Sequence, residues 1–216
     1  MAQAAPIKAW DIAFGTHVGD LPETEFVDPA CGGNGGPPGL RLPSFEDFMK
    51  CRPEASGLRE VAFIYDDELE AIANARRDPM MQATETANRI LAQPVTLSLL
   101  IDQTGRVQGY RIFTDPRAPE ELRLEAYGIA TVFRARYGSG SGWNCTDTPP
   151  EEGQTPIQQV FINRRCLKIA DGKQIVVESR RYFRKGEALF DPHSARQTRN
   201  AFESSARLEV IDAAYR

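Results

Sequence analysis

The sequence predicts an α+β fold in which antiparallel β-hairpins, arranged as a meander, pack against one long helix and several shorter helices. Three observations favour this class: two pairs of apolar-alternating runs, at residues 95–114 and 157–185, and one helical periodicity at residues 119–137. An apolar content of 41% and a charged content of 26% are ordinary for a globular protein, so the composition excludes global disorder. No run of 18 apolar residues occurs, which excludes a membrane-spanning helix.

The first part of the chain is predicted to place short elements around a glycine-rich loop. Residues 7–14 are expected to form a strand, residues 44–50 a short helix capped by Ser44, and residues 58–65 a strand with alternating apolar side chains. Residues 31–39 hold five glycines and two prolines, a composition that a helix or a central strand does not tolerate. Because Leu40-Arg41-Leu42-Pro43 follows in place of a phosphate-loop signature, we expect a surface loop.

The middle of the chain is predicted to contain three helices and a hairpin. Residues 66–77 and 78–93 form the first two helices, with acidic residues in the first turn of one and Pro79 at the start of the other. Residues 95–102 and 106–114 form the hairpin. The longest helix covers residues 119–137, with apolar side chains at 3.6-residue spacing: Leu122, Ala126, Ile129, Phe133 and Tyr137.

Residues 157–185 carry the clearest hairpin signal, because Asp171-Gly172 joins two apolar-alternating runs. A type I′ turn needs positive φ at both central residues, which this pair tolerates. The turn then fixes the residues expected to face one another: Ala170 with Lys173, Leu167 with Val176, Cys166 with Val177, Arg165 with Glu178, and Phe161 with Tyr182. Residues 206–211 are predicted to form a last strand, and residues 196–200 an exposed loop or a short helix.

Charge divides the chain into two halves. Residues 117–216 hold 16 Lys and Arg against 13 Asp and Glu, a net charge of +3, so the total of −4 leaves −7 for residues 1–116. We predict an N-terminal α+β half (1–116) with the Gly/Pro-rich disulfide loop, and a C-terminal half (117–216) with the long helix and the antiparallel hairpin. The two halves form either separate units or one continuous domain.

The four cysteines fall into two pairs, Cys31 with Cys51 and Cys145 with Cys166. This spacing favours two local disulfides, one of three connectivities, and each would contribute about 3 kcal/mol in the loop-entropy model. Four free thiols in a cytosolic protein are the alternative. Ala2-Gln3-Ala4 has the small-x-small form of a signal-peptidase site, although no basic or apolar region precedes it. We therefore expect a periplasmic or secreted protein whose signal peptide has been removed.

Metal and catalytic chemistry find little support in the sequence. The candidate metal ligands are Asp66, Asp67, Glu68 and Glu70, whose oxygens suit calcium. They lack the spacing of an EF-hand, and the acidic first turn of a helix explains them as well, so no cofactor is expected. The same carboxylates carry the alternative function, a hydrolase of cell-wall or glycan substrates. Because neither a nucleophile elbow nor, with oxidised cysteines, a free thiol is present, a non-catalytic protein is favoured over an enzyme.

The hairpin of residues 157–185 also contains the candidate binding residues: Arg164, Arg180, Arg181, Arg184 and Lys185. The register places Arg164 and Arg181 on one face of the hairpin and Arg180 on the other. These side chains are either solvated strand ends that protect a sheet edge or a site for an anionic partner.

The predicted function is an exported binding or envelope-accessory module that uses this basic surface for an anionic envelope component or an acidic protein surface. Aromatic and basic residues alternate at 180–185, as in single-strand nucleic-acid binders. Export and the acidic chain as a whole argue against nucleic acid. The sequence leaves the oligomeric state open.

Overall fold

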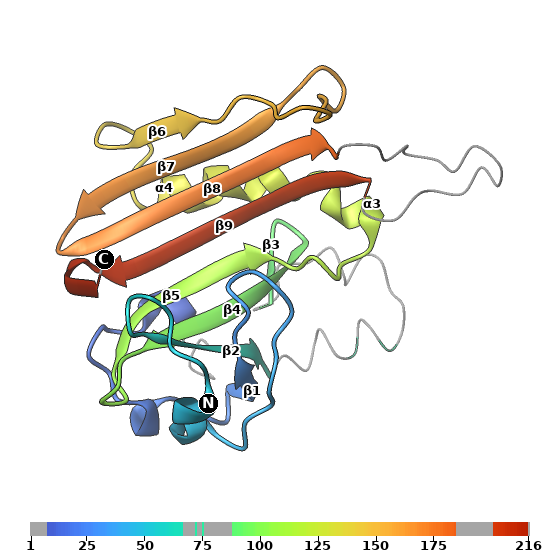
Figure 1. Ribbon diagram of the computed structural model, residues 1–216. Coiled ribbons are helices and arrows are strands. Elements are labelled where there is room, and N and C mark those ends of the chain that lie inside the picture. Colours follow the sequence, from blue (N-terminus) through green and yellow to red (C-terminus); the bar gives the residue numbers. More distant parts are fainter. Residues whose placement is uncertain (1–7, 67–71, 73–74, 76–87, 185–200, 216) are drawn as a thin grey trace, which may run out of the picture.

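One antiparallel sheet of nine strands dominates the part of the chain that the structure describes (Figure 1). This computed structural model describes residues 8–66, 72, 75, 88–184 and 201–215 of the 216-residue chain. Eight strands follow one another in the order β1-β2-β4-β5-β9-β8-β7-β6, and β3 pairs with β4 outside this path. The strands are β1 Phe26–Cys31, β2 Arg59–Tyr65, β3 Arg89–Ile90, β4 Gln93–Ile101, β5 Val107–Thr114, β6 Asn144–Asp147, β7 Ile162–Ala170, β8 Lys173–Phe183 and β9 Phe202–Asp212.

Short helices accompany the sheet, and α4 lies behind the strands β7, β8 and β9 in the view of Figure 1. With η for a 3₁₀ helix, they are η1 Ala9–Asp11, η2 Val18–Asp20, η3 Phe45–Lys50, α3 Glu120–Arg123, η4 Ala126–Gly128, α4 Ile129–Arg136 and η5 Ala213–Tyr215. Among the described residues, none of the helices has the length and apolar character needed to cross a membrane.

The predicted α+β class is wrong, because the described part of the chain folds as a β-rich protein in which strands far outnumber helices in residues. The expected long helix at residues 119–137 is helical over residues 120–136 but changes from α to 3₁₀ geometry and back. Glu125 leaves α-helical geometry, with φ −105° and ψ 8°. The apolar periodicity did identify the packed side, since Ala126, Ile129 and Phe133 are buried.

The strand predicted at residues 7–14 is also wrong. Ala9 and Ile12 are the buried residues there, a spacing of three that fits the 3₁₀ turn η1 and not the alternation of a strand. The predicted helices at residues 66–77 and 78–93 fall largely outside the described residues. Where the second can be checked, residues 89–90 form β3 and β4 begins at Gln93, so its last turn is wrong.

Both hairpins are confirmed, and so is the register predicted for the one at residues 157–185. Asp171 and Gly172 have φ of 52° and 70°, and β7 pairs with β8 as the type I′ turn requires, with Arg165 opposite Glu178. The rings of Phe161 and Tyr182 stack at 5.3 Å. The strand at 58–65, the strand at 206–211 and the helix capped by Ser44 are present as β2, β9 and η3, and the Ser44 Oγ accepts from the Glu46 amide. Three further strands, β1, β3 and β6, were not predicted.

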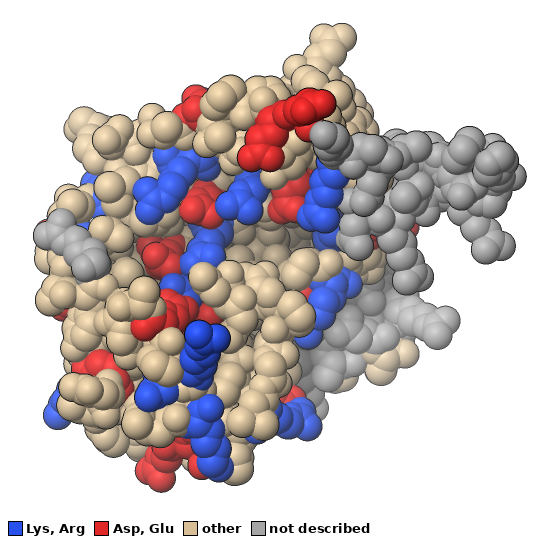
Figure 2. All heavy atoms as spheres, in the orientation of Figure 1, with Lys and Arg blue, Asp and Glu red and all other residues tan. Residues whose placement is uncertain are grey.

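The two faces of the sheet differ in chemistry. The apolar face carries the main core, including Leu97, Leu99, Ile112, Val177 and Leu208, and is covered by α4 and the N-terminal 3₁₀ helices. The opposite or polar face carries Arg111, Glu178, Arg180, Arg207 and Glu209. Figure 2 shows that acidic and basic side chains intermingle on this polar face instead of separating into two areas.

Both predicted disulfides are present. Cys31–Cys51 ties the end of β1 to the residue after η3, and Cys145–Cys166 joins the edge strand β6 to β7 at directly opposed positions. All four cysteines are paired in these two disulfides. The first one closes the loop that contains the glycine-rich segment, which is the part of the chain that reaches over the polar face.

Candidate functional site

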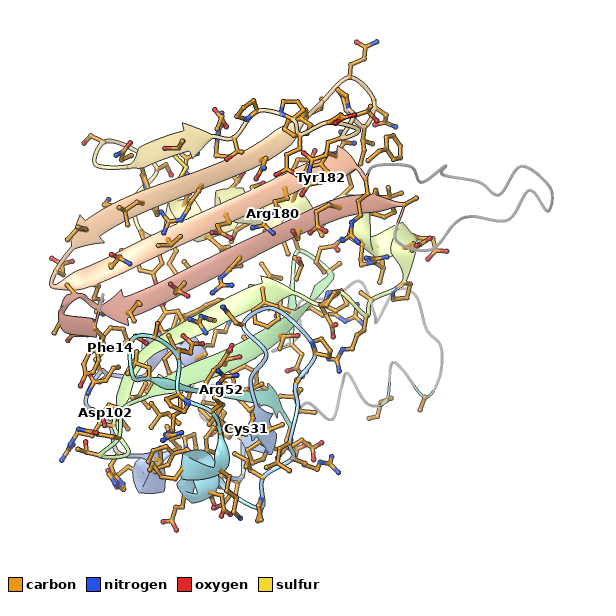
Figure 3. All side chains as sticks on the ribbon, viewed as in Figure 1. Phe14, Cys31, Arg52, Asp102, Arg180 and Tyr182 are labelled. Atoms are coloured by element: carbon orange, nitrogen blue, oxygen red, sulfur yellow. A yellow bond between two sulfur atoms is a disulfide. The ribbon has the colours of Figure 1, made fainter. Side chains whose placement is uncertain are left out.

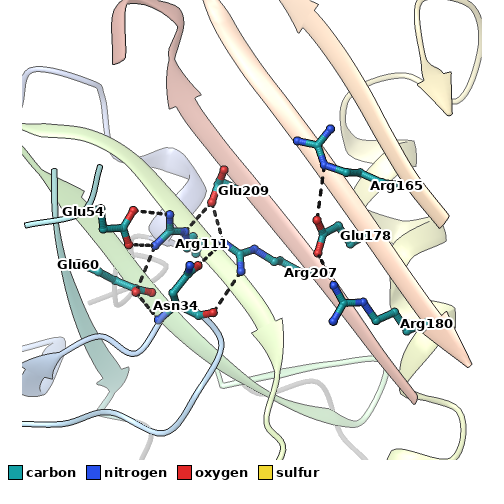
Figure 4. Close-up of polar contacts among 9 residues, drawn as sticks. All are labelled: Asn34, Glu54, Glu60, Arg111, Arg165, Glu178, Arg180, Arg207 and Glu209. Atoms are coloured by element: carbon teal, nitrogen blue, oxygen red, sulfur yellow. Dashed lines mark hydrogen bonds and ion pairs between the residues drawn. The ribbon is translucent and has the colours of Figure 1, made fainter. Parts of the chain in front are cut away.

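Arg111 is the centre of a buried charge network on the polar face (Figure 4). The guanidinium of this β5 residue is almost fully buried and contacts three carboxylates: Glu54, Glu60 and Glu209. Its Nε donates to Glu209 at 2.6 Å and its Nη2 donates to Glu54 at 2.8 Å. Burial opposes the charge, but the hydrogen bonds and charges of these carboxylates outweigh it and raise the pKa of Arg111. The carboxylates around Arg111 therefore hold its guanidinium in the charged form.

The glycine-rich loop is fixed on top of this network. Glu60 accepts a hydrogen bond of 2.7 Å from the Asn34 amide. At Gly32 an added Cβ would lie 2.2 Å from the Glu60 side chain, so only glycine permits this approach. The loop is thus a lid on buried charge, which agrees with the predicted surface loop and not with a phosphate-binding loop.

Arg207 links this lid to β9 (Figure 4). Its Nη2 donates to the Asn34 side chain at 2.6 Å and to Glu209 at 2.7 Å, and its Nη1 donates to the Asn34 carbonyl at 3.2 Å. Further along the face, Glu178 lies between Arg165 and Arg180, at 3.5 and 3.4 Å. Arginines and carboxylates thus alternate from β7 across β8 and β9 to β5.

A pocket of about 320 Å³ opens beside this row. We call it the arginine pocket, after the four guanidinium groups that line it: Arg123, Arg180, Arg184 and Arg207. Three carboxylates, those of Asp115, Glu178 and Glu203, also line the pocket, and Asn34 and Gly35 of the glycine-rich loop form part of the rim. Figure 3 locates Arg180 on β8, two residues before Tyr182.

The four arginines differ in how firmly they are held. Arg123 is 11% exposed, lies 5.4 Å from the Phe202 ring centre and has a buried Nε with no hydrogen-bond partner among the described residues. Arg180 and Arg184 are 47% and 44% exposed, and each reaches one carboxylate, Glu178 and Glu203 respectively. The pocket therefore joins an inner, stacked guanidinium to outer ones that face solvent.

The structure separates the five predicted binding residues. Arg180 and Arg184 line the arginine pocket. Arg164 lies on the opposite face of the hairpin, where its Nε and Nη2 hold Asp147 at 2.7 and 2.8 Å. Arg181 is only 4% exposed and donates to the Ile157 carbonyl at 2.7 Å, which makes it part of the core. Lys185 lies outside the described residues.

The acidic stretch predicted as a metal or hydrolase site is described only at Asp66. That residue is exposed and lines a broad groove with Asn88, while Asp67, Glu68 and Glu70 lie outside the described residues. No group of three or more metal-binding side chains occurs in the part of the chain that the structure describes. The hydrolase interpretation therefore stays a prediction.

Sequence reasoning missed three contributors to the arginine pocket: Arg123, Arg207 and Asn34. Arg123 lies in the predicted helix, and the apolar periodicity of a helix does not indicate what a single polar side chain contacts. Arg207 lies within the predicted last strand, but its place in the row of charged side chains on the polar face depends on the pairing of β9 with both β5 and β8. Asn34 was assigned only to a glycine-rich loop, and the composition of that loop does not indicate what a single side chain contacts.

Comparison with protein-family models, curated proteins and solved structures finds no significant match to this chain.

Proposed function

We propose that the protein is a non-catalytic binding module that holds an anionic group of an envelope component in the arginine pocket. The observation that carries this proposal is that four guanidinium groups, against three carboxylates, line one hollow of about 320 Å³. Guanidinium groups present several N–H donors in a fixed fork that matches phosphate, sulfate and carboxylate oxygens. The two disulfides support the compartment, because such bridges persist in oxidising surroundings.

The two outer arginines of the pocket keep N–H donors that the described residues do not use. A guanidinium carries five N–H donors. Among the described contacts, Arg180 and Arg184 each give one nitrogen to one carboxylate. These carboxylates orient the arginines without filling the hollow, so the remaining donors are available to a ligand.

The size of the pocket limits the ligand. Pockets for small molecules span roughly 300–1,000 Å³, and this one lies at the lower end of that range. We infer a single anionic group with a body no larger than a sugar: a phosphorylated or sulfated glycan end, an acidic sugar, or a lipid head group. All share oxyanion chemistry, and the experiment distinguishes their sources.

The test is calorimetric titration of the full chain with inorganic phosphate, sulfate and a sulfated disaccharide, together with sedimentation on phosphatidylglycerol and phosphatidylcholine vesicles. We expect saturable binding of at least one anionic probe and none of the phosphatidylcholine vesicles. In R180Q/R184Q the affinity should fall at least about tenfold, as the loss of charge-assisted hydrogen bonds predicts.

The matched control is R41Q/K50Q, which removes the same charge from two exposed side chains, 74% and 52% exposed, outside the arginine pocket. Both doubles should unfold at the temperature of the parent protein. If the two doubles weaken binding equally, attraction is unspecific and the proposal fails. Retained affinity in R180Q/R184Q, or no binding of any anionic probe, overturns it as well.

A further inference from the structure

A second pocket, of about 200 Å³, lies on the other side of the sheet, between α4 and the strands β7 and β8. Its walls come from η4 and α4 on one side and from the apolar face of the hairpin on the other. We call it the helix pocket. The helix pocket and the arginine pocket have no lining residue in common. Both contain residues of β8, which passes between them.

The helix pocket combines apolar walls with two arginines, of which Arg164 is paired with Asp147. Ile162, Cys166 and Val177 form apolar surface, and Tyr127 adds an aromatic ring. Arg134 of α4 reaches the same space, and its guanidinium lies 5.9 Å from the ring centre of Trp143. This lining differs from that of the arginine pocket, where guanidinium groups predominate.

Arg134 has no carboxylate partner in the part of the chain that the structure describes, unlike the other arginine of this pocket. Arg164 is neutralised by its two hydrogen bonds with Asp147 at the rim. The Arg134 Nε, in contrast, is buried and has no hydrogen-bond partner among the described residues. A buried donor without a partner costs free energy, so the pocket is electrostatically incomplete as it stands.

We propose that the helix pocket binds a small amphipathic carboxylate. The carboxylate pairs with Arg134, and the apolar body of the ligand packs between α4 and the side chains of Ile162, Cys166 and Val177. Charge complementarity fixes the sign of the ligand, and the mostly apolar walls require more than a bare anion. A volume of about 200 Å³ admits a single aromatic ring or a short alkyl chain.

The probes are benzoate and hexanoate, with benzamide and hexanol as neutral analogues and acetate as an anion without an apolar body. Binding is followed by NMR titration, with the indole N–H signal of Trp143 as a reporter beside Arg134. We expect saturable shifts for benzoate or hexanoate with Kd at or below about 1 mM, as ligands of this size allow. The neutral analogues and acetate should bind at least about tenfold more weakly.

Substitutions at two positions test separately the charge of Arg134 and the open volume of the pocket. R134Q should lower the affinity for the carboxylates toward that of the neutral analogues, whereas R134K should retain part of it. At Gly128, which lines the pocket, an added Cβ meets nothing within 4 Å, and the backbone is helical with φ −64°. G128L should therefore fill the pocket and abolish binding, while G128A leaves it open.

The arginine-pocket double R180Q/R184Q serves as the independent control, because those side chains do not line the helix pocket. It should leave benzoate binding unchanged, so the two proposals fail separately. Equal affinity for benzoate and benzamide would overturn the role of Arg134. Unchanged binding in G128L, or no saturable shift with either carboxylate, would overturn the site itself.

Discussion

Arg181 was predicted to bind a partner, but in the structure it supports the chain. It is 4% exposed, donates to the Ile157 carbonyl at 2.7 Å and to the Gln158 side chain at 3.2 Å, and lies 5.0 Å from the ring centre of Tyr127. Its closest carboxylate, Glu125, is 4.0 Å away and 68% exposed. Carbonyl dipoles and a ring face therefore replace an ion pair. Reversing this charge would damage the fold, so it does not test binding.

Asp102 shows the opposite case, a carboxylate held ionised by its own loop. Burial alone would raise its pKa, but hydrogen bonds from Thr104, Gln108 and the Arg106 amide lower the pKa to about 2. An unperturbed aspartate titrates near 3.9. Since the folded pKa is the lower one, the stabilisation is complete above about pH 4 and is lost as the pH falls toward 2.

We expect D102N to lower the free energy of unfolding at pH 7 by on the order of 1–2 kcal/mol. The difference from the parent protein should shrink as the pH falls from about 4 to about 2, because the parent carboxylate then takes up a proton. Urea unfolding at a series of pH values measures this. D20N, at an exposed aspartate, is the control. A difference that does not depend on pH would contradict the assignment.

At the scale of elements, both hairpins and the register of β7 with β8 followed from the sequence because they depend on local rules. A period of two and a turn with tolerated positive φ are enough to align β7 with β8. The helical segment at residues 120–136 was less predictable, since burial on one side does not show where α geometry gives way to 3₁₀. Strands β1 and β6 carry weak patterns, and their partners in the sheet define them.

The turn between β3 and β4 has a strained backbone, which its residue types do not indicate. Leu91 and Ala92 both have positive φ, 49° and 62°, between the paired residues Ile90 and Gln93. This is the backbone of a type I′ turn without the residues that favour it. A left-handed conformation costs a residue with a side chain roughly 1–2 kcal/mol.

Replacing this turn by L91N/A92G should raise the free energy of unfolding by about 1–2 kcal/mol, because Asn and Gly tolerate the positive φ. The measurement is the midpoint of urea unfolding at an unchanged m value. The control is the same pair of residues in reverse order, L91G/A92N. An unaltered midpoint would mean that the strain is absent in solution.

For the whole molecule, the sequence could not predict which residues gather on the polar face. Arg111 meets Glu209 because β5 pairs with β9. It meets Glu60 because β4 pairs with both β2 and β5, and it meets Glu54 because the segment between Cys51 and β2 lies over the polar face. Each of these contacts joins segments that no local pattern connects. The candidate site was therefore predicted in part, at Arg180 and Arg184, while its other half came from tertiary structure.

The two disulfides should differ in their effect on binding. Non-reducing mass measurement should show the loss of about four hydrogens and peptides joined as Cys31–Cys51 and Cys145–Cys166. Replacing either pair by serine should cost about 3 kcal/mol of stability in the loop-entropy model. Only C31S/C51S should also weaken anion binding, because that bridge closes the loop that carries Asn34 to the arginine pocket. Equal loss of anion binding in C145S/C166S would contradict this assignment.

The position of β9 between β5 and β8 has a consequence for how the chain is made. Ile112 is paired with Leu208, a separation of 96 positions, so the two parts of the sheet join only after residues 202–212 have left the ribosome. Pairings over such distances form slowly, and until they form the neighbouring strands present open, apolar edges. A chain halted before β9 should accordingly be bound by chaperones or aggregate, while each disulfide, which closes a loop of about twenty residues, is able to form beforehand. Synthesis thus leaves a long interval in which the molecule is cross-linked but not yet folded.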